Sequence, residues 1–255
     1  VSQVQIDSVT GDLLLTLAGT QTILTEQAPK AWQTVNGKEI SVPIKYTQYS
    51  DGSFGFTLGK YDSSLAVNID PTLTYSTFLG GSNLDDAEAV VIDAEGNIYI
   101  TGTTNSPDYP VQAPLQSEKN GSEVVFVTKL NPAGDTMLFS TYLGGNDDDE
   151  GNALAVDPAG NVYLAGQTFS DDFPTANAYS DQCTAGEGFC MGDAFLAKLT
   201  PTGDALTYGT YLGGNEPDDA MGVAVDATGR AYLTGTTMSK NFPTVLPFQE
   251  TLKGW

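Results

Sequence analysis

The chain lacks histidine and has few basic residues. Its 255 residues include 10 Lys and Arg against 32 Asp and Glu, which gives a net charge of −22. Without histidine, nucleophilic sites that use an imidazole base and metal sites built on imidazole are excluded. So negative a charge repels phosphate backbones and anionic lipid surfaces, and we expect no nucleic-acid partner. The same charge attracts cations and favours solubility.

Long apolar runs and helical periodicity are also absent. No apolar stretch approaches the roughly 18 residues of a membrane-spanning helix, so we expect no membrane span. No signal peptide begins at Val1, because no basic segment leads into an apolar one there. The phosphate-binding pattern GxxxxGK[ST] does not occur either.

Cysteine is scarce. Cys183 and Cys190 lie close together in the segment DQCTAGEGFCMG. A zinc site needs four suitable ligands at tighter spacing, which this segment does not offer. We interpret the two cysteines as a short-loop disulfide, which indicates an oxidising compartment. The alternative is a pair of free thiols in a cytosolic protein.

One long phrase is written three times. The segment LTYSTFLGG at Leu73 recurs near Leu138 and Leu206, at intervals of about 65 residues. An acidic stretch follows each copy, and then a second shared phrase, VIDAEGNIYITGTT in its first occurrence. Such a repeat predicts a modular fold in which each unit covers the apolar face of its neighbour.

Residues 1–71 do not carry the repeat and predict a small β-sheet domain. Turn pairs such as Asn36-Gly37 and Asp51-Gly52 favour hairpins, because both residues tolerate positive φ. The strands expected here are Val4–Val9, Leu13–Leu17, Ile40–Tyr46, Phe54–Leu58 and Leu65–Ile69.

Residues 72–255 form the repeat region, and each unit offers four strands. Stretches such as AVVI, VVFV and AFLA are apolar on both faces, so their sheets are covered on both sides. Tandem four-stranded antiparallel units of this kind are typical of propeller blades. The expected strands are 89–93, 97–102, 124–130 and 137–143 in the first unit, and 153–157, 161–166, 193–199 and 206–212 in the second.

The fold class that we predict is therefore all-β: a small N-terminal sheet domain followed by propeller-type blades. Propellers close with about four to eight blades. This chain supplies a leading strand at Leu73–Gly81, two four-strand units and two further strands, which is an incomplete propeller. We expect the remainder of a longer chain, or other copies of this one, to complete it, since an open arc exposes apolar faces and strand edges.

The repeat resembles the SBBP family of β-propeller repeats. The phrases that carry the resemblance are Tyr75–Gly81, Asp157–Thr168, Phe173-Pro174-Thr175 and Asp193–Leu199. The N-terminal part is similar to the domain that often precedes these repeats, at Ala28–Gln33, Gly37, Val42, Phe56, Tyr61-Asp62 and Ile69–Pro71. The resemblance implies a secreted or surface-exposed protein without a family-wide catalytic activity, and it supplies no catalytic residues.

The acidic stretches after each LGG are the best candidate sites. Clustered carboxylates with nearby amide and carbonyl oxygens are hard ligands suited to Ca²⁺. The alternative is that Asp and Asn occupy these turns because they hydrogen-bond the nearby backbone. The candidate calcium ligands are Asp85, Asp86, Asp147, Asp149, Glu150, Asp218 and Asp219.

These features predict a non-enzymatic extracellular or cell-surface scaffold with a structural or adhesive role. The first alternative is a module that binds surface glycans or proteins. Such a module should expose aromatic side chains around one pocket. The repeated position Tyr109, Phe173 and Phe242 precedes a proline in a loop, so it is the aromatic position to check for exposure. The second alternative is a polysaccharide-active enzyme that uses a carboxylate pair. Acidic residues are so abundant here that a pair of them is weak evidence for such an enzyme.

Overall fold

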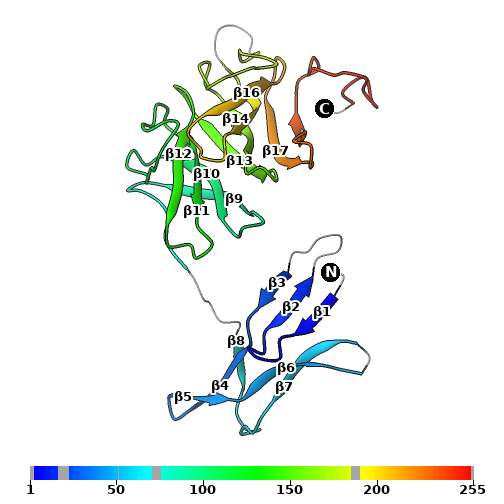
Figure 1. Cartoon of the computed structure of the whole chain (residues 1–255). Coiled ribbons are helices and arrows are strands. Elements are labelled where there is room, and N and C mark those ends of the chain that lie inside the picture. Colours follow the sequence, from blue (N-terminus) through cyan, green and yellow to red (C-terminus); the bar gives the residue numbers. More distant parts are fainter. Residues whose placement is uncertain (1–2, 17–22, 51, 71–75, 185–189, 254–255) are drawn as a thin grey trace. The chain divides into compact units, whose positions relative to one another are not determined.

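The chain folds into two compact units, Val1–Ser76 and Thr77–Trp255 (Figure 1). The computed structural model describes residues 3–16, 23–50, 52–70, 76–184 and 190–253. Within these ranges every regular element is a strand, which confirms the all-β class. The described residues contain no helix with the length and apolar character needed to cross a bilayer.

The N-terminal unit contains small antiparallel sheets, ordered β1-β2-β3, β5-β4-β8 and β6-β7 in its described part. Sequence reasoning missed β3 and β4, and it joined β5 and β6 into one strand. They are separate because Pro43 lies between them, and proline has no N–H to offer a strand ladder. Asp51, of the predicted Asp51-Gly52 turn, lies outside the described residues. The strands are β1 Gln3–Ile6, β2 Leu13–Thr16, β3 Ile23–Glu26, β4 Lys30–Val35, β5 Lys38–Val42, β6 Ile44–Gln48, β7 Phe54–Leu58 and β8 Asn68–Asp70.

The repeat unit consists of blades, each an antiparallel meander that runs from an inner to an outer strand. Blade 1 comprises β9 Asp85–Ile92, β10 Ile98–Thr104, β11 Val124–Leu130 and β12 Met137–Leu143. Blade 2 comprises β13 Asp149–Val156, β14 Val162–Thr168, β15 Asp193–Leu199 and β16 Leu206–Leu212. Blade 3 is represented by β17 Asp218–Val225 and β18 Ala231–Thr237. The inner strand β13 contacts both β9 and β17, so the three inner strands are neighbours.

A capped turn joins the first two strands of each blade. In blade 1 the Asp93 carboxylate accepts hydrogen bonds from the backbone N–H groups of Glu95 and Asn97, at 3.0 and 2.8 Å. Gly96 follows with a φ of 86°, a conformation that favours glycine. Asp157 and Asp226 cap the equivalent turns in the same way.

A β-bulge interrupts each inner strand and explains a repeated glycine. In blade 2 the pairing of β13 with β14 skips Asn152, and Gly166 lies opposite the irregularity. A Cβ on Gly166 would lie 1.8 Å from the carbonyl oxygen of Glu150, so only glycine fits there. Gly102 and Gly235 meet the same constraint in the other blades. Because of the bulge, the inner strands begin four residues earlier than the sequence predicted, and they include part of the acidic stretch.

Neighbouring blades pack face to face through large apolar side chains. Tyr99 and Phe139 of blade 1 and Leu154 and Leu164 of blade 2 belong to one buried cluster. Because the same positions recur in each blade, blade 2 offers one face to blade 1 and the opposite face to blade 3.

The predicted leading strand is wrong in its described part. Residues 76–81 form no strand, and the side chain of Phe78 is fully exposed. In later copies this segment is the outer strand β12 or β16, which pairs with β11 or β15. Among the described residues no such strand precedes the first copy, so its backbone has no ladder to join. Residues 73–75 lie outside the described part of the chain.

Candidate functional site

The first acidic residue of each inner strand closes the turn before it. Asp149 is fully buried, and its Oδ2 accepts a hydrogen bond from the backbone N–H of Gly145 at 2.7 Å. Asp85 and Asp218 accept equivalent bonds from Gly81 and Gly214, at 2.7 and 2.6 Å. In each case the donor is the second glycine of an LGG phrase.

Hydroxyl groups supply further hydrogen bonds to the same carboxylates. Asp149 also accepts from the Thr168 Oγ1 hydroxyl, and from Ser170 Oγ at 3.0 Å. Thr104 and Ser106 donate to Asp85 in the same pattern. Burial raises the pKa of Asp149 to about 6 even though these donors lower it. The geometry gives Asp85 and Asp149 a structural role as turn caps.

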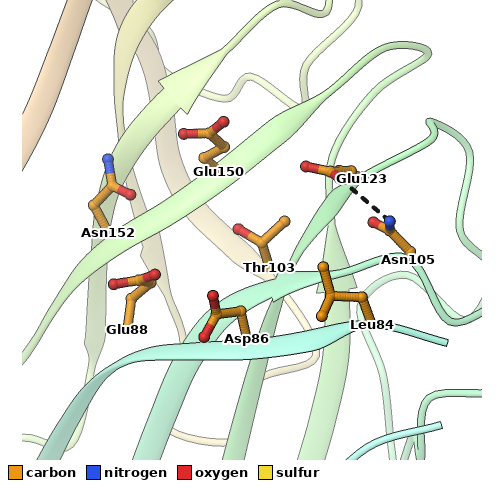
Figure 2. A pocket seen from close by; sticks show the side chains of 8 residues that line it. All are labelled: Leu84, Asp86, Glu88, Thr103, Asn105, Glu123, Glu150 and Asn152. Carbon is orange, nitrogen blue, oxygen red and sulfur yellow. Dashed lines mark hydrogen bonds between the residues drawn. The ribbon is translucent and has the colours of Figure 1, made fainter.

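The next acidic residue points the other way. Asp86 of blade 1 and Glu150 of blade 2 line one pocket of about 220 Å³ between the two blades (Figure 2). Glu88 and Asn152, which occupy the two bulges, reach the same pocket. The complete lining is Leu84, Asp86, Glu88, Thr103, Asn105, Glu123, Glu150 and Asn152.

Electrostatics in this pocket favour a cation. Burial raises the pKa of Glu150, and the nearby carboxylates of Asp219, Glu123, Asp148 and Glu88 raise it further. None of the side chains that line the pocket is basic. Two amide groups hydrogen-bond to carboxylates here and partly offset their charge. Asn105 Nδ2 donates to Glu123 Oε1 at 3.2 Å, and Asn152 Nδ2 donates to Asp219 Oδ1 at 2.8 Å. Carboxylates crowded in this way attract positive charge.

The predicted calcium ligands therefore fall into separate places. Asp86 and Glu150 share the pocket, and Asp219 is linked to it through Asn152. Asp147 is exposed, and its Oδ1 accepts from the backbone N–H of Asp148 at 3.0 Å. Across the described ranges, no three acidic or thiol side chains converge closely enough to hold an ion. Calcium binding stays a prediction.

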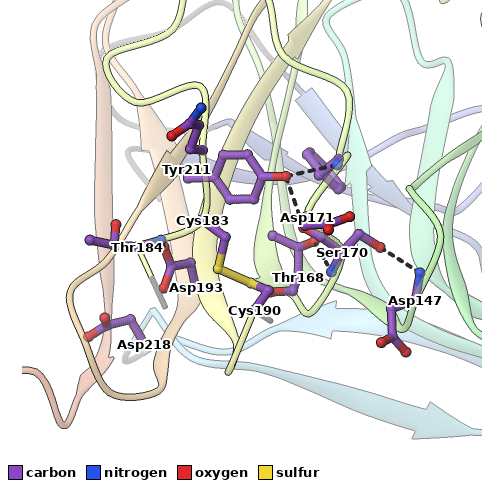
Figure 3. Close-up of a disulfide and its surroundings, with 12 residues drawn as sticks. Asp147, Thr168, Ser170, Asp171, Cys183, Thr184, Cys190, Asp193, Tyr211 and Asp218 are labelled. Atoms are coloured by element: carbon purple, nitrogen blue, oxygen red, sulfur yellow. Dashed lines mark hydrogen bonds between the residues drawn. A yellow bond between two sulfur atoms is a disulfide. The ribbon is translucent and has the colours of Figure 1, made fainter. Parts of the chain in front are cut away.

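The structure joins Cys183 and Cys190 in a disulfide (Figure 3). It also buries the repeated aromatic position that a glycan-binding surface would need to expose. Tyr109 and Phe173 are each 2% exposed, and their rings lie 4.5 Å from those of Phe126 and Phe195. Their equivalent Phe242 is half-buried. These side chains pack the blades.

Sequence reasoning missed several members of the pocket. Glu88, Glu123 and Asn152 are not in the candidate set, because that set follows acidic positions that recur in the repeat. The positions equivalent to Glu88 and Glu123 are not acidic in the other units, and Asn152 is not acidic itself. The available signal was a glycine within the second strand of every unit, since a mid-strand glycine often marks a bulge.

Antiparallel blades that pack face to face, with their inner strands side by side, define a β-propeller-type repeat protein. The β-propeller repeat model (SBBP) matches residues 74–110, 138–174 and 207–243, so the chain carries three matches to this repeat. Residues 1–72 match a domain of unknown function, DUF7948.

A weaker similarity links the chain to a bacterial protein. The sequence is 26% identical over 208 residues to the "Regulatory protein FlaEY" of Caulobacter vibrioides. The match covers 77% of this chain and 20% of that protein. The chain thus spans about a fifth of the length of the relative that it matches.

Proposed function

We propose that this chain is part of a non-enzymatic, extracellular structural or adhesive scaffold, whose repeats are completed by further blades of the same kind. The observation that carries the proposal is a contrast between equivalent positions. Tyr99 and Tyr163 are fully buried under the next blade, whereas their equivalent in blade 3, Tyr232, is 55% exposed.

The opposite end of the array shows the complementary contrast. Leu154 of blade 2 is 6% exposed because blade 1 covers it, whereas its blade 1 equivalent, Val90, is 64% exposed. The face around Val90 is thus of the type that packs against the face around Tyr232. Inside the repeat unit, faces equivalent to these two pack against each other at the blade junctions. We therefore infer that a further blade of the same repeat covers the Val90 face and the Tyr232 face.

Backbone pairing supports the same occupant. Strand β18 pairs with β17 on one side only in the described structure. In blades 1 and 2 the equivalent strands β10 and β14 also pair with β11 and β15. An exposed edge of this kind is a template for another strand.

Composition and chemistry support the scaffold role. The Cys183–Cys190 disulfide is compatible with an oxidising, extracellular setting. The buried cap Asp149 is occupied by backbone and hydroxyl donors, and the sequence has no histidine to serve as a catalytic base. The Caulobacter relative is named for regulation and not for a reaction.

Crosslinking tests the completion of the array. A chain with Val90→Cys and Tyr232→Cys is expected to form intermolecular disulfides under mild oxidation if a second copy supplies the missing blade. A chain with Val90→Cys and Tyr179→Cys is the matched control, because Tyr179 is exposed in the loop between β14 and β15. Sedimentation measured alongside reports the size of the assembly.

The alternative source is the same polypeptide. If further repeats in the whole native protein supply the blades, the isolated chain stays monomeric. Cysteines at 90 and 232 then resist maleimide labelling only in the whole protein. Monomeric behaviour together with free labelling at both positions in the whole protein would refute the completion. Labelling of intact cells with a membrane-impermeant reagent tests the extracellular location separately.

A further inference from the structure

Two buried carboxylates meet at the junction between blades 2 and 3. Asp193 begins β15 and is 2% exposed, and Asp218 begins β17 and is 1% exposed. The backbone N–H of Asp218 donates to the carbonyl oxygen of Gly192 at 2.8 Å, which places the two strand starts side by side. A Cβ on Gly213 would lie 2.5 Å from Asp193 Cγ, and the next residue, Gly214, donates its N–H to Asp218. Both carboxylates therefore lie against the same glycine turn.

The junction between blades 1 and 2 has a different residue at this position. There Val124 stands where blade 2 has Asp193. A Cβ on Gly144 would lie 2.6 Å from Asp149 Oδ2 and 3.0 Å from Val124 Cγ1. The residue at this position thus lies beside the capping carboxylate, and Asp193 brings a second carboxylate where Val124 brings methyl groups.

Hydrogen bonding at the second junction is incomplete. Asp218 Oδ2 accepts from Gly214 N and from Ser239 Oγ, at 2.6 and 2.8 Å. Its Oδ1 is buried and accepts from no group of the described structure, although the same atom of Asp149 accepts from Thr168. Neither Asp193 nor Asp218 has an ion pair within the described residues. Buried carboxylates without a compensating charge are costly, so this junction calls for a positive charge.

The disulfide keeps a backbone hydrogen-bond donor beside the two carboxylates. Thr184 follows Cys183 and donates its backbone N–H to Asp193 Oδ2 at 2.8 Å. Cys190 lies three residues before Asp193, so the bridge keeps both ends of its loop near the carboxylates (Figure 3). Burial raises the pKa of Asp193, and the neighbouring Asp218 raises it further, which agrees with two close negative charges.

We propose that the Asp193–Asp218 junction binds one divalent cation, and that this cation is Ca²⁺. The donors are carboxylate oxygens, and neither a free thiol nor an imidazole stands beside them, which favours a hard ion over zinc or copper. Water and backbone carbonyl oxygens would complete the coordination. With two carboxylates we expect weak binding, with a Kd on the order of 10⁻⁴ to 10⁻³ M, as in extracellular calcium modules. The site is distinct from the acidic pocket between blades 1 and 2.

Calorimetric titration of the whole chain with CaCl₂, paired with thermal melts in Ca²⁺ or in EDTA, tests this assignment. We expect one site per chain and a rise in melting temperature of roughly 5 °C at 10 mM Ca²⁺. Asp193→Val reproduces the blade 1–2 junction and should abolish both signals. Asp193→Asn keeps the side-chain shape and provides a second variant if the valine form folds poorly. Glu95→Gln, at an exposed turn position of blade 1, is the matched control and should bind Ca²⁺ as the unmodified chain does. Glu150→Gln tests the acidic pocket separately.

Three results would overturn the assignment. The first is an unmodified chain that shows no binding heat and melts at the same temperature in Ca²⁺ and in EDTA. The second is a folded Asp193 variant that binds as tightly as the unmodified chain. The third is loss of binding in Glu150→Gln with binding retained in Asp193→Asn, which would move the cation to the pocket.

Discussion

The tyrosine at the second position of the second strand of each blade offers a test of blade-on-blade packing. Tyr163 and Tyr232 occupy equivalent positions, and the hydroxyl of each donates to the Asp that caps its own turn, at 3.1 Å. Only Tyr163 is covered by a following blade, where its hydroxyl also donates to the carbonyl oxygen of Gly229 at 3.1 Å. Replacing each of the two tyrosines by alanine removes the same atoms. The two sites differ in whether a following blade covers the side chain.

The expected difference follows from the exposed areas. Tyr163 is fully buried and Tyr232 is 55% exposed. Since a tyrosine buries about 200 Å² when fully covered, the difference is roughly 110 Å². At about 25 cal/mol per Å² this corresponds to about 3 kcal/mol. Tyr163→Ala should therefore lower the free energy of unfolding of the repeat unit by about 3 kcal/mol more than Tyr232→Ala.

Urea denaturation of the whole chain, followed by circular dichroism, measures both values under identical conditions. The concentration must be low enough to keep the chain monomeric, because a second copy that covers Tyr232 would erase the contrast. Raising the protein concentration then becomes a second readout, in which the cost of Tyr232→Ala grows if copies associate. Equal costs for the two variants in a demonstrably monomeric chain would refute the reasoning.

Three further predictions concern the bulge, a capped turn and the disulfide. Gly166→Ala places a Cβ 1.8 Å from a backbone oxygen, so it should cost at least about 3 kcal/mol and lower the melting temperature sharply; an unchanged melt would contradict the bulge geometry. Burial acts to raise the pKa of Asp157, but hydrogen bonds from Asn161 and Tyr163 hold it below its usual 3.8. The stability that this carboxylate contributes is present above that value and lost as the pH falls below it, so the urea midpoint should fall at pH 3 less in Asp157→Asn than in the unmodified chain. Replacing both cysteines by serine should cost about 2 kcal/mol in the same assay, because it frees a short loop in the unfolded chain; an equal midpoint would show that the bridge adds nothing.

The outer strands were predictable because their signals are local. The expected ranges 124–130, 137–143, 193–199 and 206–212 coincide with β11, β12, β15 and β16. Strands β11 and β15 are apolar on both faces, and all four strands are bounded by glycine or proline turns, so no tertiary information is needed to locate them. The turn caps at Asp93 and Asp157 are equally local, since a side chain bonds the backbone two to four residues away.

The inner strands were predicted less well, because a bulge is a relation between two strands. A strict two-residue alternation places Asp86 and Glu88 on the same face as the other even positions of β9. It also gives no reason for the strand to include residues 85–88, which are acidic or small. The extra residue shifts that alternation, and the pairing continues as far as Asp85. Membership of the pocket depends on this shift, so it could not be derived from the spacing of the carboxylates alone.

The leading segment shows that an outer-strand sequence does not fold as a strand without its partner. Phe78 and Tyr142 occupy equivalent positions in near-identical phrases, yet the first is fully exposed and the second is 1% exposed. The difference lies in β11, whose Phe126 is paired with Tyr142, while no equivalent strand precedes Phe78 among the described residues. Each copy of the phrase can therefore form an outer strand, but it does so only where a neighbouring strand is present to pair with it. The same reasoning applies to β18, whose free edge matches the edges that β11 and β15 cover in the other blades. Among the described residues, an outer-strand phrase has no partner strand at one end of the array, and an inner pair has no outer strands at the other end. An additional blade of this repeat would complete both parts.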